Sequence, residues 1–171
     1  DEQAKFISEA VKAYPEIYFA KMVILGEGDS EQVIIPKILE HFSTDLDSHS
    51  ISVVPLGGRH VNHFWRLLDS LKIPYITLLD FDIDRNGGGF GRIKYAIEQL
   101  SNYKAVNYLH KGMLNCIPNW DDPRSPVDFT VSFNNKDETT SIINLKDELE
   151  NNNIFFSSPL DIDYSMIECF P

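Results

Sequence analysis

Three short apolar segments alternate with helical segments in the first 100 residues, and this alternation restricts the fold more than any other feature. The apolar segments are 22–25, 51–56 and 75–79, and each is followed by a glycine or an acidic residue. Short apolar runs that end in this way are typical of buried strands leading into tight turns. The order of strands and helices predicts an α/β domain with a mostly parallel sheet flanked by helices.

The helices between these strands are predicted from capping signals and apolar spacing. Asp29 and Gln32 have the spacing of a capping box and start a helix that ends near Phe42. Further helices are predicted at 61–71 and 92–100. The residues expected to face the core are Val33, Ile34, Ile38 and Leu39 in the first helix, and Phe64, Leu67, Leu68 and Leu71 in the second.

The segments on either side of this region are predicted as additions to one α/β core. Residues 1–20 form a helical lead-in, residues 21–115 the core, and residues 116–171 a C-terminal extension that adds an α/β appendage. The extension has a helix near 141–151, a strand at 154–156 and a final amphipathic segment. Because the chain starts with Asp rather than Met, we expect it to be a piece of a longer protein.

The composition indicates a folded protein of the cytoplasm. Hydrophobic residues make up 43% of the chain, which excludes wholesale disorder. No apolar run approaches the roughly 20 residues of a membrane span, and the N-terminus does not resemble a signal peptide. Cys116 and Cys169 lack neighbours at zinc-site spacing, so we expect two reduced thiols.

The net charge of −11 is unusual for a protein that binds DNA, because phosphate contacts need a basic surface. Its distribution is uneven, however. Residues 59–111 carry eight Lys and Arg against five Asp and Glu, whereas the rest of the chain carries seven against 21. Three of those five acids are Asp80, Asp82 and Asp84. A basic segment around a compact acidic cluster suits a divalent metal together with a phosphate.

The acidic cluster follows the third predicted strand. Side chains alternate in an extended chain, so Asp80, Asp82 and Asp84 project to one side. Carboxylates this close repel each other unless a cation neutralises them, and Mg²⁺ and Mn²⁺ prefer such oxygen ligands. The competing interpretations are a solvated loop or an aspartate that caps the next turn.

Two further strand ends carry candidate residues. Glu27 lies between two glycines after the first strand, where it is either a metal ligand or a surface acid in a turn. Glu31 is either a second ligand or a stabiliser of the helix N-terminus. After the second strand, Gly57, Gly58 and Arg59 form either a phosphate-binding turn or a solvated one. The glycines at 87–91 match no nucleotide-binding fingerprint.

Together these residues resemble the Toprim domain, a Rossmann-like fold shared by topoisomerases, primases and the OLD (overcoming lysogenization defect) family of nucleases. Toprim domains have a Glu after the first strand and an Asp-x-Asp after the third, which here are Glu27 and residues 80–82. The resemblance is closest to OLD-family endonucleases and covers residues 23 to about 100. Residues 155–163 also resemble an OLD-family segment. The sequence departs from the family at Gly26, where an apolar residue is more common.

The resemblance implies metal-dependent cleavage of DNA by a Toprim catalytic core at 21–115. Glu27, Asp80 and Asp82 correspond to the family's metal-binding acids and are the predicted catalytic residues. Two Mg²⁺ or Mn²⁺ ions roughly 4 Å apart would activate a water and stabilise the leaving oxygen. The further metal ligands implied are Glu31, Asp161 and Asp163, and the predicted phosphate or DNA contacts are Gly57, Gly58, Arg59, Arg85 and Lys94.

The resemblance also implies partners. OLD-family nuclease domains follow an ABC-type ATPase, and no Walker motif is present here, so this chain corresponds to the nuclease portion of an ATPase-linked protein. DNA and that ATPase in the same full-length chain are the expected partners, a homodimer is compatible with the sequence, and no membrane is expected. A role in defence against phage is an expectation for the family.

Two other functions fit part of the sequence. Phosphatases of the haloacid dehalogenase type also place an Asp-x-Asp after an apolar strand and would use Asp80 as nucleophile with Asp82. In those enzymes the motif ends the first core strand, whereas here two strand–helix units precede it. The second alternative is a Toprim module without catalytic activity that binds DNA or a protein partner.

Overall fold

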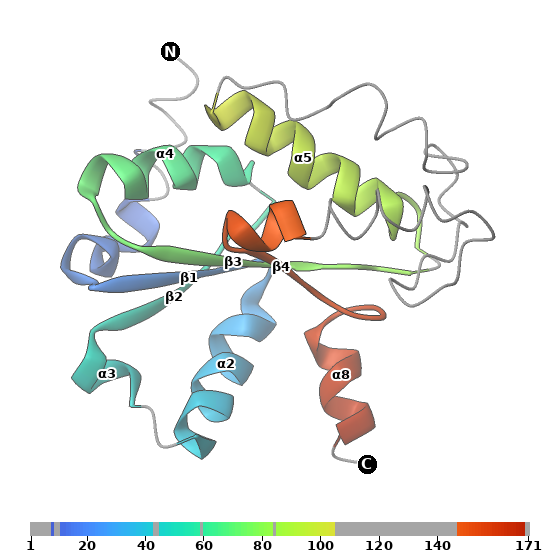
Figure 1. Ribbon diagram of the computed structural model, residues 1–171. Helices are drawn as coiled ribbons and strands as arrows, with labels where there is room; N and C mark the ends of the chain where they lie inside the picture. Colours follow the sequence, from blue (N-terminus) through green and yellow to red (C-terminus); the bar gives the residue numbers. More distant parts are fainter. Residues whose placement is uncertain are drawn as a thin grey trace. The chain divides into compact units, whose positions relative to one another are not determined.

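The computed structural model describes residues 8, 11–42, 45–58, 60–83, 85–104 and 147–169. Within residues 1–78, Figure 1 shows helices on both sides of the strands. The elements, in chain order, are η1 (Pro15–Phe19), β1 (Met22–Gly26), α2 (Asp29–His41), α3 (Leu46–His49), β2 (Ile51–Pro55), α4 (Val61–Leu71), β3 (Tyr75–Asp80), α5 (Phe90–Lys104), β4 (Ile154–Ser157) and α8 (Ile162–Cys169). Residues 147–151 are also helical.

The four strands form one sheet in the order β2-β1-β3-β4. Strand β1 pairs in parallel with β2, where Leu25 lies opposite Val54, and in parallel with β3, where Leu25 lies opposite Thr77. Parallel neighbours place their carboxyl ends at the same edge of the sheet. The predicted α/β class with a mostly parallel sheet and flanking helices is therefore confirmed.

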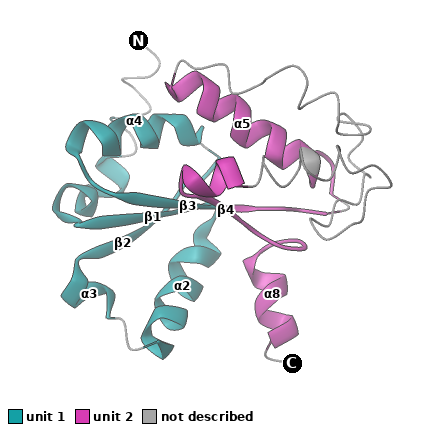
Figure 2. Ribbon diagram, in the orientation of Figure 1, with its two compact units in different colours: residues 1–78 teal, residues 79–171 magenta. Residues whose placement is uncertain are grey.

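The chain forms two compact units, residues 1–78 and 79–171, and strand β3 continues from the first into the second. Figure 2 shows the two units in separate colours. The first unit contains β1, β2 and the helices up to α4. The second contains the end of β3, α5, β4 and α8. Each unit has its own set of buried apolar side chains.

Helix α4 supplies much of the core of the first unit. It begins and ends at the predicted residues, and Phe64, Leu67 and Leu68 are buried as predicted, together with Trp65. The Trp65 indole N–H donates a hydrogen bond of 2.9 Å to the Thr77 hydroxyl of β3. This bond satisfies two buried polar groups, which is favourable because a buried polar group costs free energy unless it is hydrogen-bonded. It thereby fixes α4 against the strand that leads to Asp80.

Two predictions for the first unit are wrong. Val33 was expected in the core but is 68% exposed, because the buried face of α2 contains Glu31 and Ile35 instead. Helix α2 also has Gly28 rather than Asp29 as its N-cap residue. The four-residue helix α3 was not predicted; the Asp45 side chain accepts a hydrogen bond from the Asp47 amide at its start.

The core of the second unit is built around α5. Ile93, Ala96, Ile97 and Leu100 of this helix are buried, and so is Ile154 of β4. Their spacing of three and four residues is that of one helix face. The helix extends beyond the predicted 92–100 at both ends.

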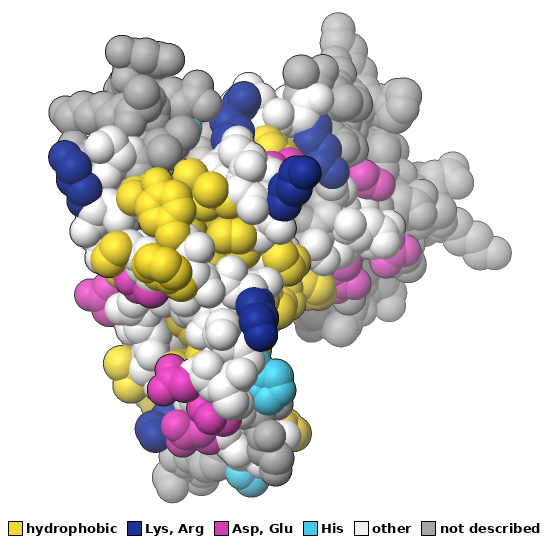
Figure 3. Space-filling model, turned by 90° about the vertical axis from the view of Figure 1, so that its left-hand side faces the viewer, with side chains coloured by type: hydrophobic (Ala, Val, Ile, Leu, Met, Phe, Trp, Pro, Cys, Tyr) yellow, Lys and Arg dark blue, Asp and Glu magenta, His cyan; other side chains and the backbone are white. Residues whose placement is uncertain are grey.

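Apolar side chains also reach the surface. Figure 3 shows hydrophobic side chains gathered on one face of the molecule, with Lys and Arg side chains around them. The most exposed large apolar residues of the first unit are Phe19, Phe42, Val33 and Tyr18. Among the described residues, no helix combines the length and the apolar character required to cross a membrane.

Candidate metal centre

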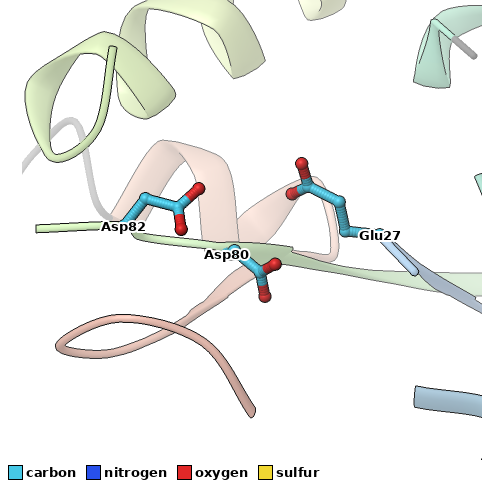
Figure 4. Close-up of side chains that lie close together, drawn as sticks. All are labelled: Glu27, Asp80 and Asp82. Atoms are coloured by element: carbon cyan, nitrogen blue, oxygen red, sulfur yellow. The ribbon is translucent and has the colours of Figure 1, made fainter. Parts of the chain in front are cut away.

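Three carboxylates meet where β1 and β3 end. Glu27 directly follows β1, Asp80 is the last residue of β3, and Asp82 lies two residues beyond. Their side chains each offer an oxygen, and these oxygens all lie within 4.8 Å of one another. Figure 4 shows the three side chains. All three are half-buried, and no other such cluster of three or more potential ligands occurs among the described residues.

This cluster has the chemistry of a divalent-cation site. Three carboxylates within 4.8 Å repel one another, and a bound cation would remove that repulsion. Carboxylate oxygens are hard ligands of the kind that Mg²⁺ and Mn²⁺ bind, and incomplete burial leaves room for the waters that Mg²⁺ retains. The residues present therefore fit the metal that the sequence predicts.

Asp80 is held through both its side chain and its backbone. The Ser157 hydroxyl of β4 donates a hydrogen bond of 3.1 Å to Asp80 Oδ1. The Arg92 Nε–H of α5 donates one of 3.0 Å to the Asp80 carbonyl oxygen. Ser157 lies 77 residues further along the chain, and no local pattern predicts this contact. The only indication is that Ser157 falls within the segment that resembles OLD proteins.

Asp82 carries an ion pair on each carboxylate oxygen. Arg85 Nη1 lies 2.6 Å from Oδ1, and Arg92 Nη2 lies 3.0 Å from Oδ2. The Asp82 side chain is 14% exposed, so both ion pairs are partly shielded from water. Its backbone is left-handed, with φ of 53°, a conformation that Asp and Asn adopt more readily than most residues.

Arg85 also links Asp82 to Asp161. Its Nη2 lies 2.7 Å from Asp161 Oδ2, while the other Asp161 oxygen accepts a hydrogen bond of 2.8 Å from the Tyr164 amide and so caps α8. The Tyr164 hydrogen bond is the main reason that the pKa of Asp161 lies below its ordinary value; burial acts against it, and the Arg85 pair adds to it. The pKa of Arg85 is raised, first by the hydrogen bond to Asp161 and then by the charge of Asp82.

The other predicted metal ligands lie outside the three-carboxylate group. Both Asp161 oxygens have protein partners, as described above, and Asp163 is an exposed residue in the first turn of α8. Glu31 is 2% exposed, and its Oε2 accepts a hydrogen bond of 2.9 Å from the Gly28 amide. Glu31 thus has the helix-stabilising role that competed with metal binding in the sequence, and its role as a ligand stays a prediction.

The packing around Glu31 explains the unusual Gly26. A Cβ atom on Gly26 would lie 2.6 Å from Glu31 Cγ and closer still to Glu31 Cβ, well inside van der Waals contact. A side chain at position 26 and a buried Glu31 are therefore incompatible without a shift of α2. Gly26, which stands where an apolar residue is more common in the family, therefore leaves room for Glu31 one helical turn after Glu27.

The predicted phosphate-binding residues are only partly described. Gly57 and Gly58 have φ of 56° and 74°, and the Gly57 amide donates to the Glu27 carbonyl oxygen at 3.3 Å. Lys94 lies half-buried on α5. Arg59 and Asp84 lie outside the described residues, as does Cys116, while Cys169 is a free, exposed cysteine.

Gly88 is a positioning residue that the sequence did not reveal. It is buried, and a Cβ atom there would lie 2.6 Å from the Asp82 carbonyl carbon and closer still to its oxygen. The neighbouring Gly89 amide donates a hydrogen bond of 2.7 Å to the Phe81 carbonyl oxygen. The glycine-rich loop is thus packed against the backbone of the Asp-x-Asp segment.

Comparison with known proteins finds a matching sequence family and two relatives that are named endonucleases. Residues 18–82 match the sequence family described as "Overcoming lysogenization defect protein-like, TOPRIM domain". The chain is 30% identical over 104 residues to endonuclease GajA of Bacillus cereus strain VD045, covering 61% of this chain and 17% of that protein. It is 25% identical over 87 residues to endonuclease GajA of strain HuB5-5, covering 50% of this chain and 12% of that protein. The chain therefore spans less than a fifth of the length of these relatives.

Solved structures support the fold. The C-terminal region of the Xanthomonas campestris pv. campestris OLD protein superposes with a TM-score of 0.54 at 22% identity, covering 88% of this chain and 56% of that one. The C-terminal region of the Burkholderia pseudomallei OLD protein gives 0.52 at 22% identity, covering 83% and 56%. The resemblance to an OLD-like Toprim domain, inferred from Glu27, Asp80 and Asp82, is thus confirmed.

Proposed function

We propose that this chain is the nuclease portion of a metal-dependent DNA endonuclease. The observation that carries the proposal is the meeting of Glu27, Asp80 and Asp82 within 4.8 Å at the ends of adjacent parallel strands. The two GajA relatives are named endonucleases, which supports hydrolysis of phosphodiester bonds over other reactions of a metal site. The OLD-like Toprim match includes all three acids.

In this proposal the three carboxylates hold one or two Mg²⁺ or Mn²⁺ ions. The bound metal supplies an activated water and stabilises the oxygen that leaves the scissile phosphate. Ser157 occupies one oxygen of Asp80 and so orients its carboxylate. Arg92 contacts both the Asp80 carbonyl oxygen and one Asp82 carboxylate oxygen, and so holds the two aspartates in a fixed position relative to each other. Such outer contacts position metal ligands and tune their basicity.

A second ion would need ligands beyond this group. Glu31, Asp161 and Asp163 are the candidates, and an ion bound by Glu31 or Asp161 would share their carboxylates with the protein groups that they contact now. We further propose that Arg85 and Lys94, together with the glycines at 57 and 58, contact DNA phosphates. The same proposal includes three expectations for the full-length protein: an ABC-type ATPase elsewhere in the chain, assembly as a homodimer and a cytoplasmic location.

The test is cleavage of supercoiled plasmid with Mg²⁺ or Mn²⁺, comparing the wild type with Asp80→Asn. We expect metal-dependent nicking that EDTA abolishes and that Asp80→Asn reduces by at least about 100-fold, since ligand loss removes transition-state stabilisation. Asp147→Asn, which makes the same chemical change at an exposed helical residue, is the matched control.

The outcomes separate the alternatives. Cleavage by Asp80→Asn at the wild-type rate would refute the proposal. A wild type that binds Mn²⁺ through Asp80 but does not cut, even within its full-length protein, would indicate the binding module. A covalent phosphate trapped on Asp80 would indicate the phosphatase.

A further inference from the structure

The ion pairs around Asp82 distinguish two arginines. Arg92 is 23% exposed and is fixed at two points, because its Nε–H donates to the Asp80 carbonyl while its Nη2 pairs with Asp82. Arg85 is 55% exposed and contacts only carboxylates in the interactions given above, one oxygen each of Asp82 and Asp161. Both pairs belong to the second unit, within residues 79–171.

Arg85 therefore lies where a bound cation would neutralise both Asp82 and Asp161. Its two terminal nitrogens each reach a different carboxylate, at 2.6 and 2.7 Å, and both carboxylates are only 14% exposed. A bidentate guanidinium offsets repulsion between two acids in the same way as a bound metal does. A metal ion that coordinates Asp82 Oδ1 would bind the same oxygen that Arg85 now pairs with, and the two positive charges so close together would repel each other.

We propose that Arg85 is an exchangeable internal counter-ion, which a divalent metal displaces from Asp82 when it binds. This inference rests on the metal centre of the proposed function, and it adds that metal and guanidinium compete for one oxygen. Exposure makes Arg85 the arginine that can leave, whereas Arg92 is held in place by the Asp80 backbone. Once released from Asp82, the guanidinium is available to a phosphate oxygen of the substrate.

Competition has a reciprocal consequence. If Arg85 weakens metal binding by some factor, bound metal weakens the Arg85–Asp82 pair by the same factor. Removing the guanidinium should then tighten metal binding, although it deletes two ion pairs. A guanidinium that only positioned Asp82 for the metal would have the opposite effect, since its loss would leave the ligand less ordered.

The experiment is titration of Mn²⁺ by calorimetry into the wild type, Arg85→Gln and Lys37→Gln. Lys37 is an exposed partner of Glu40 on α2, so its substitution removes one positive charge without touching the site. We expect Arg85→Gln to lower the Mn²⁺ dissociation constant by about tenfold, within the usual range of coupling between sites, and Lys37→Gln to leave it unchanged. Circular dichroism verifies that the variants are folded, and Arg85→Lys, which keeps the charge but not the two-pronged geometry, should lie between Arg85→Gln and the wild type.

Each outcome decides the inference. An unchanged or increased dissociation constant in folded Arg85→Gln would overturn it and leave the proposed nuclease intact. Failure of both the wild type and Arg85→Gln to bind Mn²⁺ would overturn the metal centre and this inference together. As an independent readout, Mg²⁺ added to the wild type should shift the Arg85 Nε–H resonance while leaving that of Arg66 in place; no shift in a protein that binds Mg²⁺ would contradict the exchange.

Discussion

Replacement of Gly88 by alanine should damage the metal centre without altering any ligand. The added Cβ would lie 2.6 Å from the Asp82 carbonyl carbon, whereas ordinary contacts begin near 3.4 Å. The obstructing atoms belong to the backbone, so they cannot move aside as a flexible side chain would. Relief requires a shift of Asp82 or of the glycine loop by more than about 1 Å, because the Asp82 carbonyl oxygen lies closer still to the added Cβ, and an error of about 1 Å in a catalytic group can already cost about 100-fold in rate.

The assay for Gly88→Ala combines the plasmid-nicking rate with the Mn²⁺ dissociation constant. We expect the rate to fall by about 100-fold and metal binding to weaken, while stability falls by about 1–3 kcal/mol, as is usual for overpacking. A folded Gly88→Ala protein that binds Mn²⁺ and cuts within threefold of the wild type would refute the reasoning.

Two neighbouring glycines serve as controls for Gly88. A Cβ at Gly87 meets no atom within 4 Å, but φ there is +78°, so Gly87→Ala adds backbone strain without a clash. A Cβ at Gly91 also meets open space, and no positive φ applies, so Gly91→Ala should leave both readouts unchanged. The difference between Gly88→Ala and Gly87→Ala isolates the steric effect on Asp82.

Two further predictions concern stability. Asp161→Ala should lower the free energy of unfolding by about 1 kcal/mol at pH 7 through loss of the α8 cap. Because folding lowers the pKa of Asp161, its contribution is complete above the ordinary value of 3.8 and is lost as pH falls through the lower folded value. Urea unfolding of both proteins between pH 7 and 2 should show this difference shrinking in acid; a constant difference would count against the assignment. Gly26→Ala should destabilise by about 1–3 kcal/mol because of the clash with Glu31, and unchanged urea unfolding would contradict that packing.

The parts of the fold that local sequence determines were predicted well. Apolar runs that end in Gly or Asp located β1, β2 and β3, and apolar spacing located α4 to the residue. The convergence of Glu27 with Asp80 follows from one further rule, that parallel strands bring their carboxyl ends together. The fold class and the central acids are therefore predictable from the sequence alone.

The failures have a physical cause in each case. Helix α3 has four residues, too few for a periodic signal. The prediction for Val33 is wrong because it assumed that only apolar residues line the buried face of α2, whereas Glu31 is buried on that face as well. The contacts of Ser157 with Asp80 and of Arg85 with Asp161 span 77 and 76 residues, and no spacing rule predicts such tertiary pairs.

The residues that hold Asp80 and Asp82 in place lie beyond the segment that the Toprim family model matches. The family match ends at residue 82, yet the supporting hydrogen bonds and ion pairs come from Arg85, Arg92, Ser157 and Asp161. A shortened chain that stopped at residue 104 would keep every acid of the cluster but lose Ser157 and Asp161. The segment that the family model matches is thus shorter than the segment that supplies the contacts of the cluster, and truncation studies should retain the chain through α8.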